Sequence, residues 1–397
     1  MTRISTVTFQ TDAVNQMDAL QAAMSKTQNQ LSTGKKLQSA ADDPAGMVQV
    51  NQLSTAISAS TQYVTNGNAA SANLKLEEQA LSDATNTLQS ARSLAVQANN
   101  STYSAAQRQD IATQLQQQLQ DLVAISNRQD SNGNYLFAGI AAGTTPFSQS
   151  NGSVTYAGSN VVNLVQISAN QRISTGDTGA AVFMNIPAGN GTFTTAAAAT
   201  NSGSASIGPG SVTNAGAWVP DTYTIAFSSP TQYTVKNSGG TTVTTGTYTD
   251  GDTISFNGIQ VTLSGAPATN DQFTVAPAGK ASVFSTLNNL ITTLSAPGMS
   301  NAQIATKLNS ALEQIDGAIT NLSNVSASVG ARINSITSSQ STAQTVRTNL
   351  QGQISSLSDV DYAAAVTQLS TEQLSLQATQ ASYASIAKLS LFNYLHG

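Results

Sequence analysis

The chain contains no cysteine and few charged residues. Of its 397 residues 9% are charged, against roughly 25% in an average domain. The lack of cysteine excludes disulfides, thiolate nucleophiles and cysteine-based metal sites. The formal net charge is −5 and no basic cluster occurs, which argues against nucleic acid and against an anionic membrane surface as partners. The polar surface must come from Gln, Asn, Ser and Thr, a composition that fits an exported protein.

The chain also lacks long apolar runs. No stretch of about 18 apolar residues is present, so we expect no transmembrane helix. The opening MTRISTVTFQTDAVNQ has no apolar core of the kind that secretory signals carry. If the protein leaves the cell, we expect it to do so without cleavage of a signal peptide.

Residues suited to catalysis or to metal binding are scarce. The one histidine, His396, is second from the end, where no fixed cleft is expected to orient it. Asp42 and Asp43 could be paired catalytic carboxylates, but their place before a proline is typical of a helix cap. The stretch DSNGN (130–134) lacks the later Gly and Glu of a calcium loop. Trp218 is either a core residue or a platform for a sugar ring. We therefore predict no enzyme, no cofactor and no metal site.

Proline is nearly absent outside the middle of the chain. Seven of the nine prolines lie between Pro146 and Pro277, so 45–145 and 298–397 are free of proline except for Pro44 and Pro297 at their borders. Freedom from proline is what long helices require. The sequence therefore predicts a mainly α fold with a β-rich domain inserted in mid-chain.

The middle segment, 148–280, shows the period-two patterning of β-strands between turn signals. Asn257–Gly258 is a typical two-residue hairpin turn. The low-complexity stretch TAAAATNSGSASIGPGS (195–211) predicts a mobile loop. The patterning is seen in 222–227 and 232–235, and in 254–263, which the hairpin turn divides.

Apolar residues recur at heptad spacing on both helical arms. On the C-terminal arm they run from Leu308 to Leu357 with alternating spacings of four and three, and on the N-terminal arm Leu74 and Leu81 begin a seven-residue repeat. NNSTYS (99–104) predicts a break between two N-terminal helices. The pattern predicts that the long N- and C-terminal helices form a rod-like coiled-coil bundle.

A second amphipathic pair of helices is predicted at the two chain ends. Their apolar seams have few local partners, so we expect these helices to order fully only on assembly. We interpret the seams as an assembly interface in a coiled coil. Its candidate residues are Met17, Leu20, Met24, Leu31, Val366, Leu369, Leu376, Tyr383, Ile386, Leu389, Leu391, Phe392 and Leu395.

These patterns predict three domains. Residues 1–35 with 358–397 form a terminal coiled-coil tip that faces the core of an assembly. Residues 36–147 with 281–357 form a helical rod. Residues 148–280 form a β-rich outer domain.

Five motifs spread over the chain are STGKKLQSAADDPAG (32–46), SNGNYLFAG (131–139), QRISTGDTGAAVFMNI (171–186), SVGARINSI (328–336) and LSLFNYL (389–395). Five motifs in one order are far more specific than any one of them. Together they resemble the flagellin superfamily, and within it the branch of hook–filament junction proteins. The ending His396–Gly397 extends past the point where related chains tend to stop.

The resemblance implies a structural subunit of the bacterial flagellum, located outside the cell in the zone that joins hook to filament. It implies export through the flagellar type III channel and a cytoplasmic export chaperone on the C-terminal tip. The implied partners are further copies of the chain, another hook-associated protein on the hook side and flagellin on the filament side. The alternatives are a filament flagellin subunit and, in a different class, a secreted type III tip or translocator protein.

Overall fold

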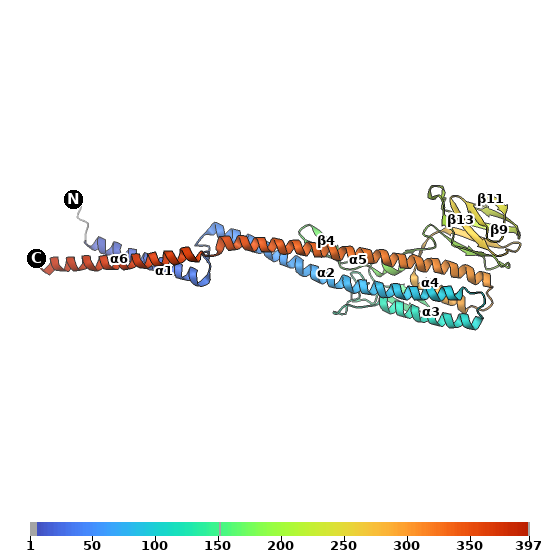
Figure 1. Cartoon of the computed structure of the whole chain (residues 1–397), viewed down its shortest axis with the longest axis horizontal. Coiled ribbons are helices and arrows are strands. Elements are labelled where there is room, and N and C mark those ends of the chain that lie inside the picture. Colours follow the sequence, from blue (N-terminus) through green and yellow to red (C-terminus); the bar gives the residue numbers. More distant parts are fainter. Residues whose placement is uncertain (1–5, 151, 396–397) are drawn as a thin grey trace. The chain divides into compact units, whose positions relative to one another are not determined.

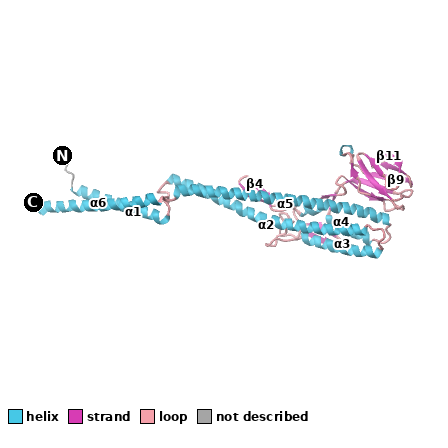
Figure 2. Ribbon diagram, in the orientation of Figure 1, coloured by secondary structure: helices cyan, strands magenta, loops and turns pink. Residues whose placement is uncertain are grey.

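A computed structural model describes residues 6–150 and 152–395, with side chains for 8–150 and 152–385. Long N- and C-terminal helices flank a β-rich middle, which confirms the predicted fold class (Figures 1 and 2). The helices are α1 (Thr6–Thr33), α2 (Pro44–Ala98), α3 (Ala105–Ser126), α4 (Val283–Ser295), α5 (Asn301–Ser358) and α6 (Tyr362–Leu395).

The chain forms two compact units, of which the first comprises 1–65 with 340–397 and the second 66–339. In the first unit α1 packs against α6, and the two helices run antiparallel (Figure 1). The start of α2 lies beside the end of α5 in the same unit, where the Ser60 hydroxyl donates to the Ala343 carbonyl over 2.9 Å.

The N-terminal helices begin and end where the sequence predicts. Asp43 caps α2, because its Oδ1 accepts the Ala45 N–H over 3.1 Å and proline follows at the first helical position. The predicted break at 99–104 separates α2 from α3. There Ser104 and Gln107 form a reciprocal capping box that satisfies two backbone N–H groups of the new helix.

The second unit contains a helical core built by α2, α3, α4 and α5 around leucines such as Leu88, Leu115 and Leu287. A cluster of aromatic rings extends this core, in which Phe183 lies 5.1 Å from Phe137 and 5.8 Å from Phe284 between ring centroids. The elements that add side chains to it or pair beside it are β1 (Phe147–Ser150), β2 (Ser153–Tyr156), β3 (Leu164–Ser168), β4 (Gln171–Ser174), the π-helix η1 (Ala180–Met184) and β5 (Ile186–Pro187).

A β-sandwich forms a separate core in the same unit. One sheet has the order β11-β10-β9-β14-β6, and the other has the order β12-β13-β7, with β8 also paired to β13. Their buried faces meet through side chains such as Phe227, Phe273, Val261 and Leu263. Its elements are β6 (Phe193–Ala197), β7 (Ser206–Ile207), β8 (Ser211–Val212), the 3-10 helix η2 (Ala215–Ala217), β9 (Tyr223–Ser229), β10 (Gln232–Lys236), β11 (Thr242–Thr247), β12 (Thr253–Phe256), β13 (Ile259–Ser264) and β14 (Gln272–Pro277).

The predicted inserted domain, 148–280, is therefore divided between two cores. Its first part, up to β5, packs with the helices, and only its second part forms the sandwich. A short pair of strands closes the sandwich at its base, because β15 (Lys280–Ala281) pairs antiparallel with β5.

The segment 195–211 is not the mobile loop that its composition predicted. It contributes the end of β6, β7 and the start of β8 to the sandwich. The buried carboxylate of Asp271 accepts the backbone N–H groups of Ser202 and Gly203, which fixes the connection between β6 and β7. A Cβ at Gly203 would lie 2.4 Å from the Ala268 nitrogen, so the small residues here permit close backbone packing.

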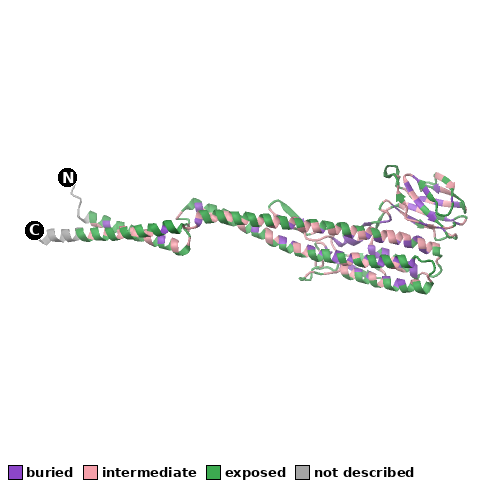
Figure 3. Cartoon of the chain, in the orientation of Figure 1, coloured by how far each residue is buried: buried purple, intermediate pink, exposed green. Residues whose placement is uncertain are grey.

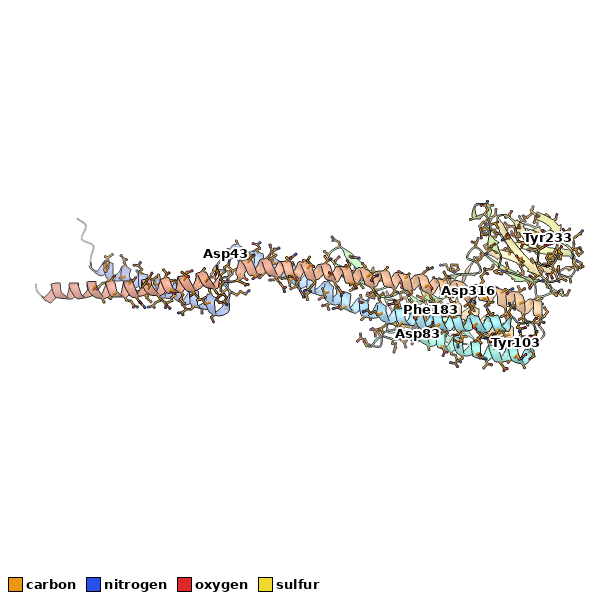
Figure 4. All side chains as sticks on the ribbon, viewed as in Figure 1. Asp43, Asp83, Tyr103, Phe183, Tyr233 and Asp316 are labelled. Atoms are coloured by element: carbon orange, nitrogen blue, oxygen red, sulfur yellow. The ribbon has the colours of Figure 1, made fainter. Side chains whose placement is uncertain are left out.

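Hydroxyl groups, rather than charges, cover much of the helical surface. Serine and threonine side chains repeatedly donate to the carbonyl one turn earlier, as Thr55 does to Asn51 over 2.9 Å. Ion pairs are few among the described residues. Asp316 on α5 pairs with Arg92 on α2, and Asp83 on α2 pairs with Arg128, which follows α3; all four side chains are partly exposed. The two aspartates are labelled in Figure 4.

Candidate assembly surface

The α1–α6 pair carries the candidate interface predicted at the chain ends. Both helices are largely exposed or half-buried, with few buried residues (Figure 3). The candidates with described side chains, other than Val366, are half-buried against the opposite helix or its surroundings. They are Met17, Leu20, Met24, Leu31, Leu369, Leu376 and Tyr383. The side chains of Ile386, Leu389, Leu391, Phe392 and Leu395 lie outside those that the structure describes.

The seam between α1 and α6 includes positions that the sequence reading missed. Ala13 and Thr27 on α1 and Ala365 on α6 are buried, and Glu372 and Thr379 on α6 are half-buried. Together with the predicted residues they complete an unbroken alternation of three- and four-residue spacings on each helix. The spacing itself could have found these positions, but their small or polar side chains concealed them.

Several apolar side chains of this pair face solvent. Val366 is 52% exposed, because it lies next to the seam position Ala365 and not in the seam. Leu374 is 67% exposed and Tyr362 57%. On α1, Val14 is 41% exposed. Two helices alone therefore leave these apolar side chains uncovered.

The α1–α6 pair and the α2–α5 pair of the first unit are separated by a joint, formed by residues 34–36 and 358–360. The Lys36 N–H donates to the Ser358 carbonyl over 2.7 Å, and the Val360 N–H donates to the Gly34 carbonyl over 2.9 Å. The ammonium of Lys35 pairs with Asp359 over 2.6 Å. Hydrogen bonds from Lys35 and then Ser355 lower the pKa of Asp359 to about 2. The joint thus ties the end of α1 to the start of α6.

Asp42 and Asp43 serve this joint as structural groups. Asp42 accepts the N–H groups of Gln38 and Ser39 and pairs with Lys26 over 2.8 Å. The hydrogen bond from Lys26, followed by those from the two backbone groups, holds the pKa of Asp42 well below its usual range. Because Asp43 is occupied in capping α2, the two carboxylates do not form an acid–base pair.

A buried carboxylate lies in the helical core of the second unit. Glu77 on α2 is 1% exposed, and its Oε1 accepts the Asp177 N–H over 3.0 Å. Arg332 on α5 pairs with the Asp177 carboxylate. Burial, and then the charge of Asp177, raise the pKa of Glu77 to about 8, while Arg332 acts in the opposite direction. Two of the motifs singled out above, 171–186 and 328–336, meet at this cluster.

The described residues offer little else that suggests chemistry. No group of three or more His, Asp or Glu side chains in 6–150 and 152–395 is placed to hold a metal ion. No helix in the same ranges has the length and apolarity to cross a membrane. Trp218 is half-buried and lies 5.7 Å from both Phe193 and Tyr223 between ring centroids, which fits a sandwich core residue. His396 lies outside the described residues.

The helical ends and the sandwich each match a family model. Residues 4–142 match the bacterial flagellin N-terminal helical region, and residues 312–395 match the bacterial flagellin C-terminal helical region. Residues 196–277 match the D2-like domain of flagellar hook-associated protein 1. The fold and its paired terminal helices thus define a flagellin-type protein.

More similar relatives identify a narrower family within the flagellin-type proteins. FlgL of Xanthomonas campestris is 32% identical, with a TM-score of 0.71 over 76% of this chain and 99% of that one. The flagellar junction protein FlgL of Legionella pneumophila is 33% identical, with a TM-score of 0.68 over 73% and 99%. The flagellar hook-associated protein 3 of Salmonella typhimurium is 34% identical over 184 residues, 46% of this chain and 57% of that protein. The chain belongs to the flagellar hook-associated protein 3 (FlgL) family. It spans only about half the length of the curated relatives that it matches.

Proposed function

We propose that the protein is a structural subunit of the bacterial flagellum that forms the zone between hook and filament. The observation that carries the proposal is the α1–α6 pair, whose seam and exposed apolar residues need further partners. It is supported by the likeness to FlgL chains along nearly their whole length. A solved relative of that kind is described as a flagellar junction protein.

The α1–α6 surface would be covered by neighbouring subunits. Leu374, Val366 and Tyr362 are each more than half exposed. Burial of roughly 100 Å² of apolar surface contributes about 2.5 kcal/mol, so a few such contacts per subunit are enough to order a helix pair. We infer that the thirteen candidate residues named above form the coiled-coil and assembly interface of the tip, with the seam residues between α1 and α6 and the exposed ones, such as Val366, towards neighbouring subunits.

The partners follow from the position in the flagellum. Further copies of the chain would form a ring or a short helical zone, with another hook-associated protein on the hook side and flagellin on the filament side. Export through the flagellar type III channel, with a cytoplasmic chaperone on the C-terminal tip, would bring the chain outside the cell. The three predicted domains would then form the inner tip, the helical rod and the outer β-rich part.

A strain that lacks this chain tests the proposal. We expect flagellin to be made and exported but lost to the medium as unpolymerised monomer, because it has no base on which to assemble, and the cells should not swim. Expression of the chain from a plasmid should restore filaments. The measurements are immunoblots of cells and medium, electron microscopy of the flagella and a motility assay.

The same strain separates the alternatives. If the chain were a filament flagellin, the mutant would keep complete hooks but release no filament protein to the medium. If it were a type III tip or translocator protein, filaments and swimming would be normal. Normal filaments in the mutant would therefore refute the proposed function.

A further inference from the structure

One layer of the α1–α6 seam is polar on both helices. Thr27 on α1 is 2% exposed, and its hydroxyl lies 3.1 Å from the Ala23 carbonyl one turn earlier and 3.3 Å from Oε1 of Glu372 on α6. The side-chain amide of Gln368, one turn earlier on α6, donates to the same oxygen over 2.9 Å. Oε2 of Glu372 is buried, and it has no hydrogen-bond partner within the described part of the chain.

The neighbouring layers of the seam are apolar. Met24 and Leu31 flank Thr27 on α1, and Leu369 and Leu376 flank Glu372 on α6. Because apolar layers of similar size replace one another at low cost, the apolar layers by themselves would tolerate a slide of one heptad. The joint at Gly34 and Val360 opposes such a slide at one end of the pair, and the polar layer opposes it within the seam.

A slide in one direction would place Glu372 opposite Leu20, where only Gln368 of its own helix still donates to the carboxylate. A slide in the other direction would place it opposite Gly34, beyond the end of α1, and would also lose the contact to Thr27. Burial of a carboxylate against an apolar partner is strongly unfavourable.

We propose that Glu372 and Thr27 form a register key, meaning that their contact selects the in-register pairing of α1 with α6 over pairings shifted by one heptad. The key costs stability, since one carboxylate oxygen is buried without a partner even in the native register. It gives specificity, since every shifted pairing loses the contacts to Thr27 as well. A single polar residue at a seam position is known to fix register in coiled coils in this way.

The absence of cysteine from the chain allows a direct test by paired cysteines. Because the helices run antiparallel, the seam layer next to that of Thr27 and Glu372 pairs Met24 on α1 with Leu376 on α6. The in-register reporter is Met24→Cys with Leu376→Cys. The two shifted reporters combine Met24→Cys with Leu369→Cys or with Tyr383→Cys. Each full-length protein is oxidised mildly at low concentration, and the disulfide within the monomer is quantified on a non-reducing gel.

With Glu372 present, we expect the in-register reporter to close and the shifted reporters to reach at most about a tenth of its yield. Glu372→Leu should raise the shifted yields several-fold and raise the thermal stability of the helices, because a buried charge is replaced by apolar packing. Thr27→Val should also raise the shifted yields, since it removes the opposite half of the layer. Circular dichroism verifies that each variant is folded.

Thr379→Leu provides the matched control. Thr379 lies one heptad beyond Glu372 in the same seam, but its hydroxyl donates only within α6, to the Ser375 carbonyl over 2.8 Å. Its substitution adds apolar surface without removing a contact between helices, so the register should stay unchanged. Three outcomes would each overturn the proposal. The first is that the shifted reporters form no disulfide in either Glu372→Leu or Thr27→Val. The second is that Thr379→Leu raises their disulfide yield as much as those variants do, and the third is that the in-register reporter forms no disulfide in the parent. The disulfide yields, the thermal stability and the circular dichroism are all measured on the purified chain, so they do not depend on its role in the flagellum.

Discussion

At the scale of single residues, Glu77 makes the stability of the chain depend on pH. Its carboxyl is almost completely buried, and its raised pKa means that the folded chain binds this proton more tightly than the unfolded chain does. A group of this kind contributes stability that is present in full below its unfolded pKa, 4.5, and is lost as the pH rises toward its folded pKa of about 8. The helical core of the second unit should therefore weaken with rising pH.

We predict that Glu77→Gln removes most of this pH dependence. Each pH unit between 4.5 and 8 costs up to about 1.4 kcal/mol in the parent, so the variant should gain on the order of 3 kcal/mol relative to the parent between pH 5 and pH 8. Urea unfolding at these two pH values measures the difference. The control is Glu78→Gln, at the exposed neighbouring position, which should leave the pH slope as it is. Equal slopes in Glu77→Gln and the parent would contradict the prediction.

At the scale of elements, the joint depends on a left-handed glycine. Gly34 ends the turn after α1 with a φ of 70°, and a Cβ there would lie 2.9 Å from the Tyr362 hydroxyl. Gly352, by contrast, lies inside α5, where an added Cβ meets no atom within 4 Å. The same substitution should thus have opposite effects at the two positions.

We predict that Gly34→Ala destabilises the first unit by about 1–2 kcal/mol, the cost of a left-handed alanine, before any clash is counted. Gly352→Ala should stabilise it by about 0.5–1 kcal/mol, because alanine is the better helix former. Thermal unfolding followed by circular dichroism at 222 nm measures both. A neutral or stabilising Gly34→Ala would show that the joint does not need this conformation.

Some features of the elements could be predicted from the sequence, and others could not. Caps and turns were predictable, since Asp43, Ser104 and the Asn257–Gly258 hairpin each depend on neighbouring residues alone. Heptad spacing predicted the seams where large apolar residues occupy them. The spacing also places Thr27 and Glu372 in the seam, but their polar side chains concealed them, and their contact with each other could be identified only from the structure. Glu77 was missed for the same reason, as its partners lie 100 and more residues away.

At the scale of the whole molecule, the two cores of the middle segment divide it into parts that differ in importance for folding. Val182, Phe183 and Ile186 belong to the helical core, although they precede the sandwich in the same predicted domain. The sandwich begins and ends at one place, because β5 pairs with β15 and the Ala188 N–H donates to the Gly279 carbonyl over 2.9 Å. Period-two patterning could not distinguish strands that pack on helices from strands that pack on strands. The predicted assignment of the domains to inner, rod and outer positions stays a prediction.

We predict that the sandwich can be removed without loss of the helical core. A chain in which residues 189–278 are replaced by a two-residue Asn-Gly turn should keep cooperative unfolding and the helix content of the parent, because the strands that remain are already adjacent. Deletion of 148–280 should instead unfold the core, since it removes several buried side chains from it. Circular dichroism and urea titration compare the two. Equal stability of both deletions would show that β1–β5 are dispensable.

The hydroxyl-covered helices have a consequence for the medium in which the protein works. Dissolved salt weakens attractions between surface charges, with a screening length of about 10 Å at 0.1 M and about 3 Å at 1 M. Helix surfaces covered by hydroxyls that donate to the preceding turn have few such attractions to lose, apart from ion pairs such as Arg92–Asp316. The stability of the helices should therefore change little between low and high salt.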